Sequence, residues 1–124
     1  MAIRLDEKAQ ENLEAARHLL DREAADLCSA SASRAYFAAY LAVADLALQR
    51  GHRYPDGNYF RHNEFPQLAR TWRLLTDDQR DDLALIRDRR VKADYTQDFV
   101  DVSEASESLE IAESFVGLLE EVAP

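Results

Sequence analysis

The chain has 124 residues, of which 47% are hydrophobic, and it contains a single cysteine. This length suits one hydrophobic core, so we expect a single domain over residues 1–124, and one cysteine excludes both a disulfide framework and multi-cysteine zinc sites. The formal net charge of −9 argues against broad, sequence-independent attraction to nucleic acid, which needs many cationic contacts to phosphate, but it leaves room for a local basic patch.

Nothing in the sequence resembles a targeting or membrane-spanning segment. The first twenty residues mix acidic and basic side chains in an amphipathic pattern, unlike a signal or transit peptide. No apolar run approaches the roughly 20 residues that span a bilayer. Together with the single cysteine, these features predict a cytoplasmic protein that does not contact a membrane.

Apolar residues at steps of three or four predict two helices in the first half of the chain. The first runs from about 4 to 21 and the second from about 24 to 50, ending at Gly51 as helices often do. The middle of the second helix is rich in alanine and apolar nearly all round, which is typical of a central helix with close neighbours on several sides. The stripe of the first helix is Leu5, Ala9, Leu13, Ala16 and Leu20.

Residues 51–62, which include Pro55 and Gly57, form the one substantial loop that the sequence predicts. A third, shorter helix is expected to begin near Asn63, which places Pro66 in its first turn, where the missing N–H costs nothing. Its apolar stripe is Phe65, Leu68, Ala69, Trp72 and Leu75.

The last third of the chain predicts two long helices. Thr76 and Gln79 have the spacing of a capping box, so Thr76 should cap a fourth helix that continues to about Phe99. The fifth is expected to begin near Asp101. No alternating strand pattern is present, so we predict an all-α fold, an up-and-down bundle of four long helices plus the shorter third one.

The fourth predicted helix carries a basic segment, residues 87–92, with the sequence RDRRVK. Arg87, Arg90 and Asp94 are spaced by three and four, so they share one helix face, and Arg90 can pair with Asp94 one turn later. This face continues the apolar stripe of the helix. Because an unpaired buried charge is costly, Arg90 needs a carboxylate or phosphate partner.

Two interpretations of the basic segment remain open. In the first, Arg90 and Asp94 form an internal pair at the end of the bundle while Arg89 and Lys92 point into solvent. In the second, the planar forks of Arg87 and Arg90 hold an anion such as phosphate.

Other chemistry has weaker support in the sequence. There is no phosphate-binding glycine loop, no glycine-flanked nucleophilic serine and no His-Glu-x-x-His motif. His52 and His62 lie at the two ends of the predicted loop, but two histidines without a third ligand do not make a metal site, so we expect no metal and no cofactor. Tyr36 and Tyr95 are expected to pack with their hydroxyl groups at the rim of the core.

Two segments together resemble the HEPN domain family, and its small stand-alone prokaryotic members most closely. They are ASRAYFAAYLAVADLAL at 32–48 and RVKADY at 90–95. The resemblance implies a helical bundle that commonly forms a homodimer. Many members are RNA-cleaving toxins, often encoded beside a nucleotidyltransferase antitoxin, and their active sites use an arginine followed, after four to six residues, by a histidine.

The sequence departs from this family motif. No histidine stands at the required spacing after Arg87, Arg89 or Arg90. In the toxin form that ends in His-x-Tyr, the histidine would coincide with Ala93 and the tyrosine with Tyr95. The proton-transfer group of the family mechanism is therefore missing, which lowers the case for ribonuclease activity by that mechanism.

Three functions follow from these observations. The first is a HEPN-like dimeric module with a basic cleft near the dimer axis that binds a nucleotide, RNA or a partner nucleotidyltransferase in a toxin–antitoxin or defence system. The second is a ribonuclease toxin in which His62 or Tyr95 replaces the missing histidine, with Arg90 as a further candidate catalytic residue. The third is a structural or protein-interaction bundle braced by Arg–Asp pairs. The residues expected to line the basic cleft are Arg87, Arg90, Asp94 and Tyr95, with Arg34 and Tyr36 nearby.

Overall fold

The computed structural model describes residues 5–21, 25–53, 60–96 and 98–122, and the regular elements within these residues are all helices. The predicted helix limits at residues 4 and 24, and the loop residues Pro55 and Gly57, lie outside the described residues. Four long helices and a short third one agree with the predicted all-α bundle. They are α1 (Leu5–Leu20), α2 (Ala25–Gln49), α3 (Phe65–Thr71), α4 (Asp77–Tyr95) and α5 (Val102–Val122).

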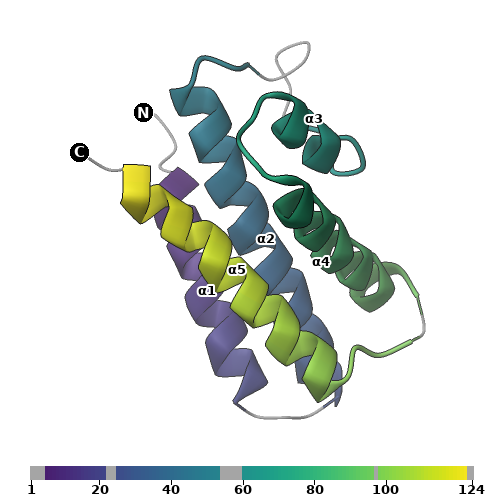
Figure 1. Ribbon diagram of the computed structural model, residues 1–124. Helices are drawn as coiled ribbons and strands as arrows, with labels where there is room; N and C mark the ends of the chain where they lie inside the picture. The colour runs from purple at the N-terminus through teal and green to yellow at the C-terminus, as the bar shows by residue number, and fades with distance from the viewer. Residues whose placement is uncertain (1–4, 22–24, 54–59, 97, 123–124) are drawn as a thin grey trace.

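The long helices are arranged up and down, and α2 lies at the centre (Figure 1). It packs against α1, α4 and α5, while α1 also contacts α5. The short helix α3 contacts α4 and lies beside its first turns (Figure 1). None of the described helices is both long and apolar enough to cross a membrane.

The composition of α2 explains its central place. Its small side chains let the backbones of neighbouring helices approach closely on several sides, which buries more apolar surface for each residue. The hydroxyl of Ser31 is fully buried and donates to the backbone carbonyl of Ala16 at 2.7 Å, which ties α2 to α1. Seven alanines of α2 are at most 1% exposed: Ala32, Ala35, Ala38, Ala39, Ala42, Ala44 and Ala47.

Two helices end in the same hydrogen-bond pattern with different residues at the left-handed position. After α2, Gly51 has a φ of 90°, its N–H donates to Leu48 and the N–H of His52 donates to Ala47. After α3, the equivalent position is Arg73, with a φ of 62°. Gly51 adopts this conformation without a steric cost, whereas Arg73 carries a Cβ that makes it unfavourable.

The boundary between α3 and α4 follows the predicted signals closely. Pro66 lies in the first turn of α3, as predicted, and the capping box is present: Gln79 N–H donates to the Thr76 hydroxyl at 3.2 Å, and Thr76 N–H donates to the Gln79 side chain at 2.9 Å. The helix ends at Thr71, although its predicted stripe extends to Leu75. Leu75 is nevertheless buried, because the turn after α3 directs it into the core.

The predicted end of the fourth helix near Phe99 is wrong, because α4 ends at Tyr95. The hydroxyl of Thr96 donates to the carbonyl of Lys92 at 2.6 Å and accepts from Asp98 N–H at 3.2 Å, so it redirects the chain. Val100 is then fully buried, and its N–H donates to the Ser29 hydroxyl at 3.0 Å. This contact anchors the connection between α4 and α5 to α2.

Candidate functional site

The basic segment of α4 divides between two faces of the helix. Arg89 and Lys92 face α5, where Arg89 donates to the carbonyl of Glu104 at 3.1 Å and to the Ser108 hydroxyl at 3.3 Å. It also pairs with Glu107 at 2.5 Å, and Lys92 donates to Glu104 at 3.2 Å. The expectation that Arg89 and Lys92 point into solvent is therefore wrong: the Arg89 side chain is only 13% exposed. These two side chains fasten α4 to α5.

Arg90 lies on the other face, which packs against α2. Its guanidinium carbon lies 5.0 Å from the ring centre of Phe37 and 5.0 Å from that of Tyr95. Its Nη2 donates to the Tyr95 hydroxyl at 3.2 Å, and its Nε lies 3.1 Å from Asp94 Oδ2. The expected pairing of Arg90 with Asp94 is thus present. The N–H of Nε does not point along this contact, so the contact is ionic rather than a hydrogen bond.

Arg87 lies one turn before Arg90 on α4 and is 26% exposed. Its only ion pair among the described residues is with Asp88, the next residue in the chain, at 2.7 Å. The Nε of Arg87 is buried and has no hydrogen-bond partner within the described part of the chain. A buried N–H of this kind is costly to leave unpaired, so a water molecule or a ligand atom is expected to meet it.

The facing surface of α2 comes from residues spaced by three and four, Ser33, Tyr36 and Phe37. The Ser33 hydroxyl donates to Asp94 Oδ2 at 3.0 Å, which holds this carboxylate between α2 and α4. The guanidinium group of Arg90 lies over the ring of Phe37 in a cation–π contact. The sequence reasoning did not single out Ser33 or Phe37. Their helical spacing from Tyr36 is the signal that could have found them.

His62, just before α3, joins the same surface. Its Nδ1 lies 2.5 Å from the Tyr36 hydroxyl, and its ring lies edge-on to Phe37 with the ring centres 5.8 Å apart. His62 and Arg90 therefore contact the same Phe37 ring. We refer to Tyr36, His62, Arg87, Arg90 and Asp94 as the α2–α4 cluster.

The charges in the cluster affect its titratable groups. Burial lowers the pKa of His62, and the positive charges of Arg90 and Arg87 lower it further. Burial also raises the pKa of Tyr36 well above its ordinary value, so the phenol keeps its proton. The cluster thus holds two permanent cations, the carboxylate of Asp94 paired with one of them, a neutral imidazole and a neutral phenol near neutral pH. The two guanidinium groups can bind phosphate oxygens, and the imidazole and phenol offer neutral hydrogen-bonding groups beside them.

Two predicted site residues lie apart from this cluster or at its edge. Arg34 is exposed and donates to the Asn12 side chain of α1 at 3.3 Å, so the structure places it on another face of α2. Tyr95 is 69% exposed and covers the outer side of Arg90. Among the described residues, no group of three or more His, Cys, Asp or Glu side chains is arranged to hold a metal ion.

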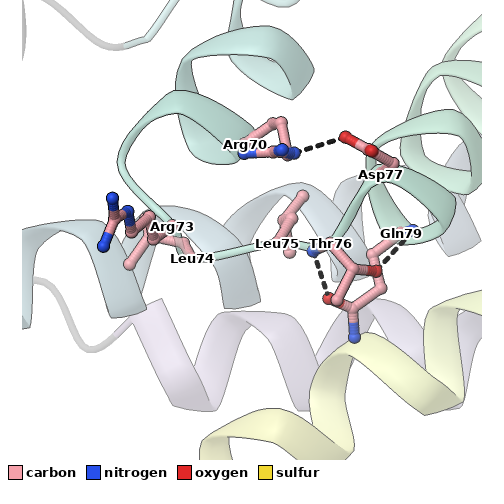
Figure 2. Close-up of a pocket in the computed structure, with 7 residues that line it drawn as sticks. All are labelled: Arg70, Arg73, Leu74, Leu75, Thr76, Asp77 and Gln79. Atoms are coloured by element: carbon pink, nitrogen blue, oxygen red, sulfur yellow. Dashed lines mark hydrogen bonds and ion pairs between the residues drawn. The ribbon is translucent and has the colours of Figure 1, made fainter.

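A separate hollow of about 450 Å³ lies at the corner between α3 and α4. Figure 2 shows Arg70 directed at Asp77, with which it forms an ion pair, while Arg73 points away from both. At the start of α4, the capping box meets the N–H groups of Thr76 and Gln79 (Figure 2). Because its helix end is capped and Arg70 is neutralised, this hollow is a poorer place for an anion than the α2–α4 cluster.

Comparison with known proteins agrees with the resemblance in the two sequence segments. No curated protein matches the chain. The family model described as the HEPN domain matches residues 3–122, which is nearly the whole chain. The chain therefore belongs to the HEPN domain family.

Proposed function

We propose that this HEPN domain binds the phosphate groups of RNA or of a nucleotide at the α2–α4 cluster. The observation that carries the proposal is the convergence of Arg87 and Arg90 beside His62, with the Nε of Arg87 buried and without a hydrogen-bond partner among the described residues. A guanidinium group binds phosphate through parallel N–H donors, and a partly desolvated setting strengthens such bonds.

The existing ion pairs of the two arginines do not prevent this binding. Asp88 is 65% exposed and adjacent to Arg87 in sequence, and exposed pairs of this kind contribute little. Asp94 is held by Ser33 and contacts Arg90 at Nε, which leaves the outer part of the guanidinium to the Tyr95 hydroxyl. A phosphate can therefore displace Asp88 and the Tyr95 hydroxyl while Asp94 keeps its contacts with Ser33 and Arg90.

The test measures binding of labelled single-stranded RNA and, separately, of a nucleoside triphosphate to the wild type and to Arg90→Ala. Loss of one charge-assisted contact is expected to weaken binding by about 10-fold or more. Arg17→Ala is the matched control, because Arg17 lies on α1 and pairs with Glu14 and Glu113. If neither ligand binds the wild type, or if both variants bind like it, the proposal fails.

A second candidate function is RNA cleavage with His62 as the proton-transfer group in place of the missing family histidine. The observation that favours it is the position of His62, close enough to Arg90 and Arg87 for their charges to lower its pKa. In such a reaction the arginines would stabilise charge on the phosphate while the histidine accepts the proton of the 2′-hydroxyl. The same RNA, analysed for fragments with the wild type and His62→Ala, separates cleavage from binding.

The proposed assembly is a homodimer in which the cluster lies near the interface. Support comes from exposed apolar side chains on α4 and in the segment after it, Val91, Tyr95 and Phe99, which are 40%, 69% and 61% exposed, and Tyr95 contacts Arg90 of the cluster. Sedimentation at micromolar concentration is expected to show a dimer, and Phe99→Asp is expected to weaken it. A wild-type monomer at that concentration would contradict this assembly but would leave phosphate binding within one chain testable.

A further inference from the structure

The hydrogen bond between Tyr36 and His62 joins a buried group to a half-buried one. The Tyr36 side chain is 1% exposed, and its hydroxyl lies 2.5 Å from Nδ1 of His62. Either atom can donate in such a pair, and the choice decides where the proton of a neutral His62 resides. The surroundings of the two groups determine which one donates.

Tyr36 is the donor because its own proton needs an acceptor. A buried hydroxyl without an acceptor loses the free energy of a hydrogen bond, and Nδ1 of His62 is the acceptor that the described residues offer. Burial keeps the phenol protonated, so the proton is always present. If Nδ1 carried a proton instead, it would donate to the Tyr36 oxygen, and the buried O–H of Tyr36 would be left without an acceptor among the described residues. Neutral His62 must then carry its proton on Nε2.

The packing around His62 fixes this arrangement. Its ring centre lies 4.5 Å from that of Tyr40, and its ring is edge-on to Phe37. These aromatic neighbours on α2 restrict the rotation of the His62 side chain to another rotamer. The groups that face it are Tyr36 and Tyr40 from α2 and the cations Arg87 and Arg90 from α4. A second proton would bring a third positive charge to this surface, which is unfavourable.

We propose that Tyr36 is a positioning residue that holds His62 as the neutral tautomer protonated on Nε2, so that His62 acts at the cluster as a hydrogen-bond donor to phosphate and not as a proton acceptor. The part that concerns phosphate rests on the proposed function. The part that concerns the tautomer rests only on the contact with Tyr36. A histidine in this form has its basic nitrogen occupied by Tyr36, so it favours binding of RNA over its cleavage.

The first experiment measures the tautomer directly, by long-range ¹H–¹⁵N NMR of the histidine side chains from about pH 8 to about pH 6, the range in which an ordinary histidine titrates. The expected result is one His62 signal set with a protonated Nε2 throughout. In Tyr36→Phe the donor is lost, so both tautomers and a higher pKa of His62 are expected. A neutral His62 protonated on Nδ1 instead of Nε2 at about pH 8 in the wild type would overturn the proposal, and this result does not depend on whether the variant folds.

The second experiment uses RNA binding with two substitutions of His62. Glutamine carries an amide N–H near the position of Nε2, so His62→Gln is expected to keep affinity within about 2-fold, while His62→Ala is expected to lose about 5-fold or more. Equal loss in both variants, or RNA cleavage that requires His62, would overturn the donor role. If the wild type binds no RNA, the proposed function fails, while the NMR result still decides the tautomer.

Discussion

The two faces of α4 carry similar cations in different surroundings. On the α5 face, Arg89 and Lys92 meet acidic and carbonyl groups of another helix, Glu104 and Glu107, so their charges are neutralised by tertiary contacts. On the α2 face, Arg90 meets the ring of Phe37, and the acidic partners of Arg87 and Arg90 come from α4 itself. A run of charges in sequence thus contains one pair of side chains that fastens helices and another that is suited to a ligand.

The positions of charged residues around the helix must therefore be considered before a run of charges in the sequence is interpreted as one site. Consecutive residues of a helix point about 100° apart, so Arg89 and Arg90 face different neighbours although they are adjacent in sequence. Of the structural interpretation, the pair of Arg90 with Asp94 is present, but Arg89 does not point into solvent. The anion interpretation stays a proposal for Arg87 and Arg90.

The largest expected effect is on stability and belongs to the α5 face. Arg89→Ala removes hydrogen bonds to Glu104, Ser108 and Glu107 from a side chain that is only 13% exposed. The free energy of unfolding, measured in urea, should fall by about 2 kcal/mol. RNA affinity should be unchanged in the folded variant. Lost affinity with unchanged stability would mean that the roles of the two faces are reversed.

The matched change on the α2 face is Arg87→Ala. Because Arg87 pairs only with exposed Asp88 among the described residues, stability should change by less than about 0.5 kcal/mol. Affinity for RNA should fall about 10-fold through the loss of one charge-assisted phosphate contact, and the salt dependence of binding should become less steep. Fluorescence anisotropy over a series of salt concentrations measures both quantities. Full affinity in this variant would remove Arg87 from the site.

Substitution of one acidic residue at each face of α4 tests the two faces separately. Asp94→Asn removes the charge beside Arg90 but keeps an oxygen for the Ser33 hydroxyl, so affinity for RNA should rise about 3-fold. Glu104→Gln, the equivalent change on the α5 face, should leave affinity unchanged and lower stability, because it weakens the contacts to Lys92 and Arg89. An equal rise in affinity for both variants would indicate general electrostatics rather than a local site.

The smallest effect concerns the pH dependence of stability through His62. Its pKa is lowered in the folded state by burial and by Arg90 and Arg87, so the unfolded chain takes up a proton more readily. Its contribution to stability is therefore complete above the unfolded pKa of about 6.5 and falls as the pH drops below that value. Urea unfolding at a series of pH values should show a shallower decline for His62→Gln. An unchanged slope would mean that His62 is not held neutral.

Much of the fold could be predicted because its signals are local. The capping box of Thr76 and Gln79 and the place of Pro66 in the first turn of α3 depend on neighbouring residues alone, and both are confirmed. The end of α4 at Tyr95 could not be predicted in the same way. It depends on the hydrogen bond from the Thr96 hydroxyl to the Lys92 carbonyl and on the hydrogen bond from Val100 N–H to Ser29, which lies 71 residues earlier.

The approximate positions of the helices, the family and the i,i+4 pairing of Arg90 with Asp94 follow from the sequence alone, because each depends on spacing along one helix or on a short motif. Only the tertiary structure decided that Arg89 faces acids on α5, that Phe37 lies under Arg90 and that His62 meets Tyr36. Those contacts join segments far apart in the chain, and the packing of α2 against its neighbours sets the distances between them.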